Sequence, residues 1–182
     1  MRTVLESQFT LKKVKRLKGG GLEINYEVVD TVGQETYYDE AQKKSSKEPH
    51  PDLVAILRSL GAEVGRILKL NTISLVVGEK DFNASAAQKD YAERAATNMF
   101  NTVRVNGISV TGTGENKGCK ILAVYQPDSM QALAVNPQIR FNADMYGFEG
   151  DVEDKLEALE KECYAYLFED KKAQLEIFDE DD

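Results

Sequence analysis

The sequence from Thr3 to Val28 reads TVLESQFTLKKVKRLKGGGLEINYEV, and it predicts the unit around which the fold is built. Thr3 to Leu17 alternates loosely between apolar and polar residues, although Val14 is out of phase with the other apolar residues. Gly19 to Gly21 favours a flexible turn, because consecutive glycines continue a strand poorly. Leu22 to Val28 alternates cleanly. The pattern therefore predicts a hairpin of two long strands.

A helix is predicted after this hairpin. Before this helix, Glu35 to Tyr38 is expected to form a third strand. The polar stretch from Ala41 to Pro49 is expected to form a loop. His50, Pro51 and Asp52 then begin a helix, since proline suits its first turn and an aspartate faces its positive end. The apolar residues that follow at helical spacing predict a face that lies on a sheet; they are Leu53, Ile56, Leu57, Leu60, Val64, Ile67 and Leu68. Gly61 and Gly65 indicate close packing of this helix against the strands.

The second half of the chain predicts more strands and a final helix. The expected strands are Ile73–Val77, Val103–Val105, Ile108–Val110, Cys119–Tyr125, Ala132–Val135 and Ile139–Phe141. Residues 82–100 are interpreted as a surface helix or lid. Asp151 is expected to cap the last helix, with Asp154 completing a capping box. The order predicts an α+β fold: antiparallel sheet built from hairpins, with two main helices packed on one face.

Length and composition predict one domain over residues 1–170 and an acidic tail over 171–182. A chain of 182 residues is long enough to bury a core without disulfides or metals. The first residues lack the apolar stretch of a secretory signal, and no run is long enough to span a membrane. Cys119 and Cys163 are expected to be buried thiols in a reducing cytoplasm, here that of a bacterial host cell.

Positive charge is concentrated near the start of the chain, although the formal net charge is −8. Lys12, Lys13, Lys15, Arg16 and Lys18 lie on the first predicted strand and its turn, and they are candidates for contacts with the phosphates of a nucleic acid. Tyr26 and Tyr37, with Tyr38, lie on the adjoining strands and offer rings on which bases can stack. The alternative is that the lysines protect an exposed edge strand and that the tyrosines are half-buried.

The end of the chain has the opposite charge. Its last residues are Ile177, Phe178, Asp179, Glu180, Asp181 and Asp182. An apolar pair among terminal acids is typical of a peptide that docks on a partner protein, and it is also able to cover a basic segment of its own chain. Two alternatives stay open: Leu175 to Phe178 forms an edge strand, or the tail serves solubility alone.

Motifs for catalysis, cofactors or metals are not evident in this sequence. The turn from Gly112 to Gly118 lacks the Gly-Lys-Ser/Thr ending of a P-loop and precedes a strand, so it predicts a hairpin loop. Glu48, His50 and Asp52 do not have a recognised zinc spacing, and they are better interpreted as a helix entry. A serine elbow and a second histidine are also missing. Neither enzymatic activity nor a bound cofactor or metal is expected.

The chain resembles small phage and prophage proteins that are encoded near replication and recombination functions. The resemblance rests on the basic hairpin, on Pro-His-Pro-Asp-Leu at Pro49–Leu53, and on the ending from Tyr166 to Phe178. The tail is similar in kind to those of single-stranded-DNA-binding proteins, but four acids follow Phe178 here, whereas those tails end on the aromatic residue. Two substantial helices also exceed what an oligonucleotide-binding barrel contains.

The expected function is that of a non-enzymatic accessory protein. It binds single-stranded nucleic acid or a phage or host replication or recombination protein. The alternative is an acidic inhibitor or anti-defence factor that imitates nucleic acid and binds a basic host protein. An enzyme that uses acids in the cleft between helix and sheet is the third hypothesis. The sequence does not indicate an oligomeric state.

Overall fold

The computed structural model describes residues 8–32, 34–68, 102–126, 131–143 and 147–171. These residues form a seven-stranded antiparallel sheet and two α-helices, which confirms the predicted α+β fold. The strands are β1 (Phe9–Arg16), β2 (Leu22–Val32), β3 (Glu35–Ser45), β4 (Val103–Thr111), β5 (Gly118–Tyr125), β6 (Leu133–Val135) and β7 (Gln138–Arg140). The helices are α1 (Pro51–Ile67) and α3 (Glu149–Phe168).

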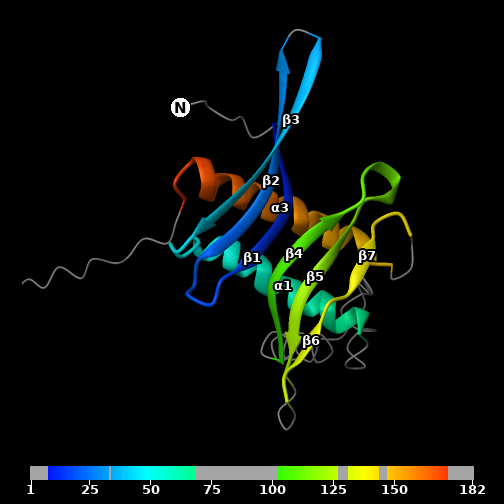
Figure 1. Ribbon diagram of the computed structural model, residues 1–182. Helices are drawn as coiled ribbons and strands as arrows, with labels where there is room; N and C mark the ends of the chain where they lie inside the picture. Colours follow the sequence, from blue (N-terminus) through cyan, green and yellow to red (C-terminus); the bar gives the residue numbers. More distant parts are fainter. Residues whose placement is uncertain (1–7, 33, 69–101, 127–130, 144–146, 172–182) are drawn as a thin grey trace, which may run out of the picture.

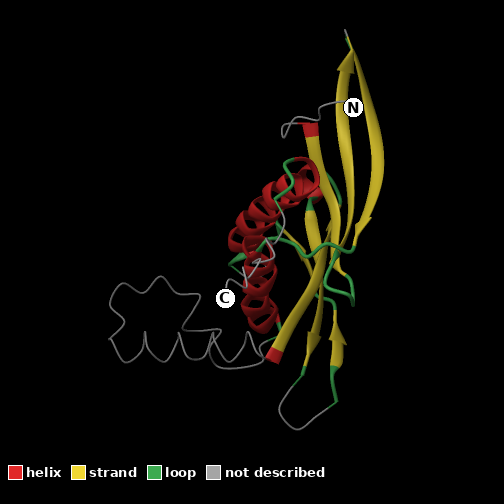
Figure 2. Cartoon of the chain, turned by 90° about the vertical axis from the view of Figure 1, so that its left-hand side faces the viewer, coloured by secondary structure: helices red, strands yellow, loops and turns green. Residues whose placement is uncertain are grey.

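Both helices cover the same face of the sheet (Figures 1 and 2). The strand order is β3-β2-β1-β4-β5-β6; β6 pairs with the last residues of β5, and β7 pairs with its first residues, Gly118–Lys120. Helix α1 packs against β4 and α3, while α3 also contacts β1. The opposite face of the sheet carries no helix of the described chain, as Figure 2 shows from the side. The sequence expectation of helices on one face is confirmed.

A bulge in β1 explains why Val14 is out of phase in the sequence. The pairing of β1 with β2 shifts between Leu11 and Lys13, so Lys12 is an extra residue on this strand. Leu11 and Val14, three positions apart, are both buried in the core as a result. The backbone N–H of Leu11 donates a hydrogen bond to Glu160 Oε1 of α3 at 2.7 Å. The bulge thus keeps the apolar residues of β1 beneath the helices.

The core lies between the sheet and the two helices. Its strand residues include Phe9, Leu11, Val14, Leu22, Ile24, Val103, Val105, Ile108, Cys119, Ile121 and Ile139. Its helix residues include Leu53, Leu57, Leu60, Val64, Val152, Leu156, Leu159 and Cys163. Both cysteines are fully buried free thiols, as the sequence predicts.

Three boundaries differ from the sequence predictions. Strand β3 continues through Ala41–Ser45, where a loop was expected, because an edge strand needs only backbone pairing with β2 and no apolar alternation. Val103 to Thr111 is one strand rather than two, interrupted in register between Val105 and Gly107. Helix α3 begins at Glu149 without a side-chain cap, and Asp151 lies inside its first turn. Asp151 instead pairs with Arg66 of α1 at 3.1 Å.

Other expectations are confirmed or lie outside the described residues. Gly112–Gly118 is a hairpin loop with a short 3-10 turn, Gly114–Asn116, between β4 and β5. The expected strand Ile73–Val77 and the surface helix or lid at 82–100 lie outside the described residues.

Candidate anion-binding site between strands β1 and β4

Two of the five cations predicted to bind phosphate are paired with acids of β2. The ammonium group of Lys12 lies 3.1 Å from Glu27 Oε2, and that of Lys13 lies 3.1 Å from Glu23 Oε1. The ammonium group of Lys44 on β3 also lies 3.4 Å from Glu23 Oε2. The hydrogen bond from Lys13 is the main reason that the pKa of the Glu23 carboxyl is lowered. The structure therefore does not leave Lys12 and Lys13 free to attract a phosphate.

The other three cations line a hollow of about 600 Å³. Lys15, Arg16 and Lys18 form one side of this hollow, and Arg104 and Asn106 of β4 form the other. The hollow lies where β1 and β4 separate, because these strands pair only over Lys13–Lys15 and Gly107–Ser109. No ion pair joins any of these cations to a carboxylate within the ranges described.

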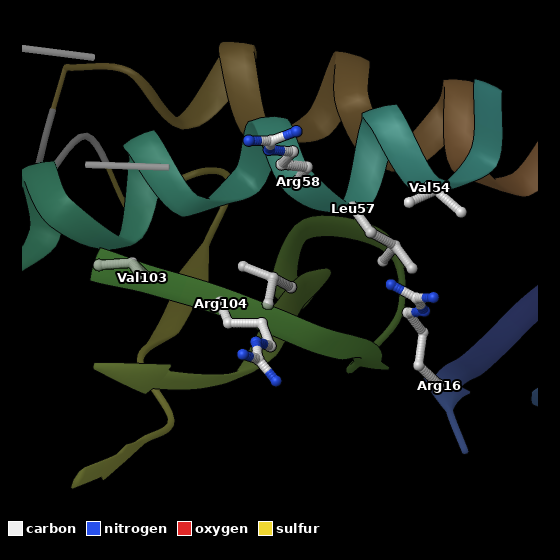
Figure 3. A pocket seen from close by; sticks show the side chains of 7 residues that line it. Arg16, Val54, Leu57, Arg58, Val103 and Arg104 are labelled. Carbon is white, nitrogen blue, oxygen red and sulfur yellow. The ribbon is translucent and has the colours of Figure 1, made fainter. Parts of the chain in front are cut away.

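A second hollow of about 410 Å³ adjoins the first and shares Arg16 and Arg104 with it. Its apolar lining comes from Val54 and Leu57 of α1 and from Val103 and Val105 of β4. Helix α1 adds a further cation, Arg58. Figure 3 shows Arg58 on the helix, Arg104 on β4, and Arg16 on β1 with its guanidinium directed toward Leu57. Three elements that are distant in sequence thus bring three arginines to one recess.

Two local features of the backbone shape the larger hollow. Asn106 is the extra residue where the register of β4 on β5 shifts, and a bulge of this kind re-aims the neighbouring side chains. The turn after β1 is closed by a hydrogen bond from the N–H of Leu17 to the carbonyl of Gly21 at 2.8 Å. A Cβ on Gly21 would lie 1.9 Å from the carbonyl oxygen of Ser45, so glycine lets this turn pack on the end of β3.

One acid lies at the rim of the larger hollow. A Cβ added to Gly20, which lines the hollow, would lie 2.8 Å from Oε1 of Glu48. The Glu48 carboxylate therefore stands beside the turn that carries Lys18. It reduces the positive potential at this end of the site without forming an ion pair with Lys15, Arg16 or Lys18 in the described structure.

The chemistry of the site suits a phosphate group. Lys15, Arg16, Lys18, Arg58 and Arg104 are gathered in a concave surface, where neighbouring cations reinforce one another's potential. The guanidinium group presents paired N–H donors that match the oxygens of a phosphate, and it remains charged at any physiological pH. The described lining is cationic, amide or aliphatic, which suits the binding of an anion.

The predicted stacking tyrosines lie elsewhere. Tyr26 packs on the helix side of the sheet. The centroid of its ring lies 5.3 Å from that of Phe9 and 5.8 Å from that of Phe168. Tyr37 is 49% exposed on β3 and donates a hydrogen bond to Glu35, which raises the pKa of the tyrosine. Neither ring lines the hollows. Tyr26 and Tyr37 do lie on β2 and β3, which continue the sheet from β1 as the sequence predicts, and base stacking on their rings stays a prediction.

Arg58 and Arg104 were not singled out from the sequence. Each carries a modest signal: Arg58 occupies the exposed face of an amphipathic helix, and Arg104 stands between two buried valines. Sequence spacing alone does not reveal that β4 lies next to β1, since some ninety residues separate them. The antiparallel pairing of these two strands brings Arg104 near Arg16, and the packing of α1 on β4 adds Arg58.

The helix entry at His50 is confirmed and forms a separate ionic cluster. The backbone N–H of Asp52 donates to His50 Nδ1 at 3.3 Å, so the imidazole caps α1. His50 and Asp52 also lie near Glu162 of α3, with ligand-type atoms within 4.8 Å of one another. The ammonium group of Lys171 lies 2.9 Å from Asp52 and 2.8 Å from Glu162.

The cation at the centre of this cluster is thus supplied by the chain itself. The hydrogen bonds to Glu162 and Asp52 raise the pKa of Lys171, and the bond from Lys171 is the main cause that lowers the pKa of Asp52. Glu48, which precedes His50 and Asp52 in the sequence, does not belong to the group. The cluster joins the start of α1 to the end of α3.

The proposed docking residues of the tail, Ile177, Phe178, Asp179, Glu180, Asp181 and Asp182, lie outside the described residues. Neither α1 nor α3 combines the length and apolar character that crossing a bilayer requires. Comparisons with protein-family models, with curated proteins and with solved structures give no match to this chain.

Proposed function

We propose that this protein binds the phosphate backbone of single-stranded nucleic acid in the paired hollows between β1, β4 and α1. The observation that carries the proposal is the convergence of Lys15, Arg16, Lys18, Arg58 and Arg104 without carboxylate partners in the described chain. These residues line two adjoining open hollows, and all of them except Arg16 are exposed. A flexible single strand can enter such hollows, whereas a rigid duplex meets only their rims.

The proposed role is non-enzymatic and accessory, in a phage-type replication or recombination complex in the bacterial cytoplasm. The contacts would be made to phosphates, because the described lining offers no aromatic ring for stacking. Binding should consequently depend little on base sequence and steeply on salt. The acidic tail would compete with nucleic acid for the basic site or engage a partner protein.

The test is a titration of a labelled single-stranded oligonucleotide, followed by fluorescence anisotropy over a series of salt concentrations. The double variant Arg16→Gln, Arg104→Gln removes the two residues that both hollows share. We expect affinity at low salt to fall about tenfold or more, and the slope of log affinity against log salt to decrease by about one for each lost phosphate contact.

The matched control is the double variant Lys12→Gln, Lys13→Gln. It removes the same total charge from the same part of the fold, but its lysines are already paired with Glu27 and Glu23. Its salt slope should remain close to that of the wild type. Equal losses in the two double variants would contradict a defined site, and no binding at low salt would overturn the proposal. Capture of a basic host protein, together with indifference to oligonucleotides, would favour the acidic-inhibitor alternative.

A further inference from the structure

Strand β3 is a long edge of the sheet, with no strand beyond it among the described residues. Its eleven residues, Glu35 to Ser45, pair with β2 along their whole length, and β3 ends the strand order. Every residue from Glu35 to Glu40 is exposed, and only Ala41 and Ser45 are half-buried. The hairpin of β2 and β3 extends beyond the helices (Figures 1 and 2). An edge of this length presents a row of backbone N–H and C=O groups that another strand can pair with.

The charges of β3 are sorted along the strand. Asp39 and Glu40 precede Ala41, and Lys43 and Lys44 follow it after one residue. An identical strand in the antiparallel direction reverses this order, so the acids of each strand meet the lysines of the other. The edge is therefore complementary to itself, which is the property that a two-fold symmetric interface requires.

Backbone geometry restricts the possible registers. In an antiparallel ladder, two residues face each other only if both direct their N–H and C=O groups toward the partner strand or both direct them away. A two-fold axis must therefore place one residue opposite its own copy. An axis at Ala41 puts Asp39 opposite Lys43 of the second copy, and Lys43 opposite its Asp39. An axis at Glu40 would instead place that acid opposite itself.

The register centred on Ala41 also uses charges that are available. Asp39, Glu40 and Lys43 form no ion pair with other residues of the described chain. Lys44 is already 3.4 Å from Glu23, and in this register it stands diagonal to Glu40 of the second copy, within reach of a long side chain. The small side chain of Ala41 leaves the axis free of steric conflict.

We propose that the protein forms a homodimer by pairing β3 with β3 of a second copy, in antiparallel register centred on Ala41. The two seven-stranded sheets then become one continuous sheet, and the exposed edge disappears. The basic hollows lie between β1 and β4, two strands away, so both remain open in the dimer. The inference is independent of what binds in those hollows.

The test measures mass in solution by sedimentation velocity over a range of protein concentrations. In the proposed register, position 39 of each copy faces position 43 of the other. Asp39→Lys therefore creates two pairs of facing lysines in the dimer, and Lys43→Asp creates two pairs of facing acids. We expect each variant to weaken self-association by about tenfold or more. Mixing the two variants restores opposite charges at both positions, so the mixture should form a heterodimer. Lys120→Asp, at an exposed position on β5, is the control and should dimerise like the wild type.

The proposal fails if the wild type is a monomer at every concentration. It also fails if the wild type dimerises but Asp39→Lys and Lys43→Asp leave the association unchanged, or if their mixture stays monomeric. Capture of a different protein by β3 in a chain that never self-associates likewise overturns it. Circular dichroism of each variant separates loss of association from loss of folding, because the altered side chains are exposed.

Discussion

Gly61 of α1 faces Val103 of β4 so closely that a Cβ added to the glycine would lie 2.8 Å from the carbonyl oxygen of Val103. This close approach holds the helix on the strand beside the smaller hollow, which both α1 and Val103 line. The distance between α1, which carries Arg58, and β4, which carries Arg104, therefore depends on a glycine. The packing of α1 and the shape of the candidate site depend on the same contact.

Gly61→Ala should destabilise the protein, although alanine is the better helix former by roughly 1 kcal/mol. The added methyl group meets backbone rather than a movable side chain, so we expect a net loss of about 1–3 kcal/mol in the free energy of unfolding. Gly150→Ala in α3 is the control, since nothing lies within 4 Å of its added Cβ. Urea denaturation should show the two alanines acting in opposite directions.

The helical part of this contact is readable in the sequence, but its strand partner is not. Periodicity from Leu53 to Leu68 gives the face of α1, and the spacing of Gly61 and Gly65 indicates close packing. The alternation of Leu22–Val28 and the triglycine turn likewise give the first hairpin. These signals succeed because burial imposes a regular apolar period on the residues themselves.

The candidate site was predicted only in part, for a different physical reason. A cation on a strand looks the same in sequence whether an acid neutralises it or not, and register alone does not decide that either. Lys15 lies opposite Glu23 in the pairing of β1 with β2, but the Glu23 carboxylate is paired with Lys13 and Lys44 instead. The long exposed β3 was likewise shortened in the prediction, because an edge strand without a buried face has no apolar period to detect.

Glu48→Gln should strengthen binding of single-stranded nucleic acid. Its carboxylate stands beside Gly20 at the rim of the larger hollow, where it opposes the approach of a phosphate. We expect the affinity for a labelled oligonucleotide to rise about two- to fivefold at low salt, and the gain to shrink as salt screens the charge. Glu169→Gln, exposed at the end of α3, makes the same charge change and should leave affinity nearly unaltered. A similar gain in both variants would mean that net charge alone is responsible.

Glu63→Ala should be destabilising, because it removes the acid that two cations share between the helices. The Glu63 carboxylate is 4% exposed, accepts a hydrogen bond from Arg66 at 2.8 Å, and also pairs with Lys155 of α3. Removing the acid leaves the buried guanidinium of Arg66 with the exposed Asp151 carboxylate, so we expect a loss of about 1.5–3 kcal/mol in unfolding free energy, below that of a buried charge with no partner. Asp154→Ala, exposed on α3, should change it by less than about 0.5 kcal/mol. Equal effects in a denaturation series would show that the buried ionic contact contributes little.

Both cysteines should be unreactive in the native protein. Cys119 and Cys163 are fully buried, and burial raises the pKa of the Cys119 thiol to about 12 and that of Cys163 further. The thiolate, which is the nucleophile, is therefore nearly absent at neutral pH. A chromogenic disulfide reagent should react with neither thiol of the folded chain on a fast timescale. After denaturation it should release two equivalents of chromophore per chain, one for each cysteine. Rapid labelling of one thiol without denaturant would indicate that its helix or strand opens locally.

Glu160→Gln should stabilise the protein at neutral pH and leave it unchanged in acid. Burial is the main cause that raises the pKa of the Glu160 carboxyl above 4.5, and the hydrogen bond from the N–H of Leu11 offsets only part of this. The unfolded chain therefore releases this proton at lower pH than the folded chain does. The wild type consequently loses unfolding free energy as pH rises from the unfolded pKa through the folded one.

Glutamine keeps an oxygen that accepts the Leu11 hydrogen bond, but it carries no charge to desolvate. The difference in unfolding free energy between Glu160→Gln and the wild type should thus be near zero below pH 4.5, grow through the titration window, and remain constant above it. Denaturation across this pH range measures the curve. Glu169→Gln at the exposed end of α3 should give a flat difference. A variant that is less stable than the wild type at neutral pH would show instead that the bulge at Leu11 requires a charged acceptor.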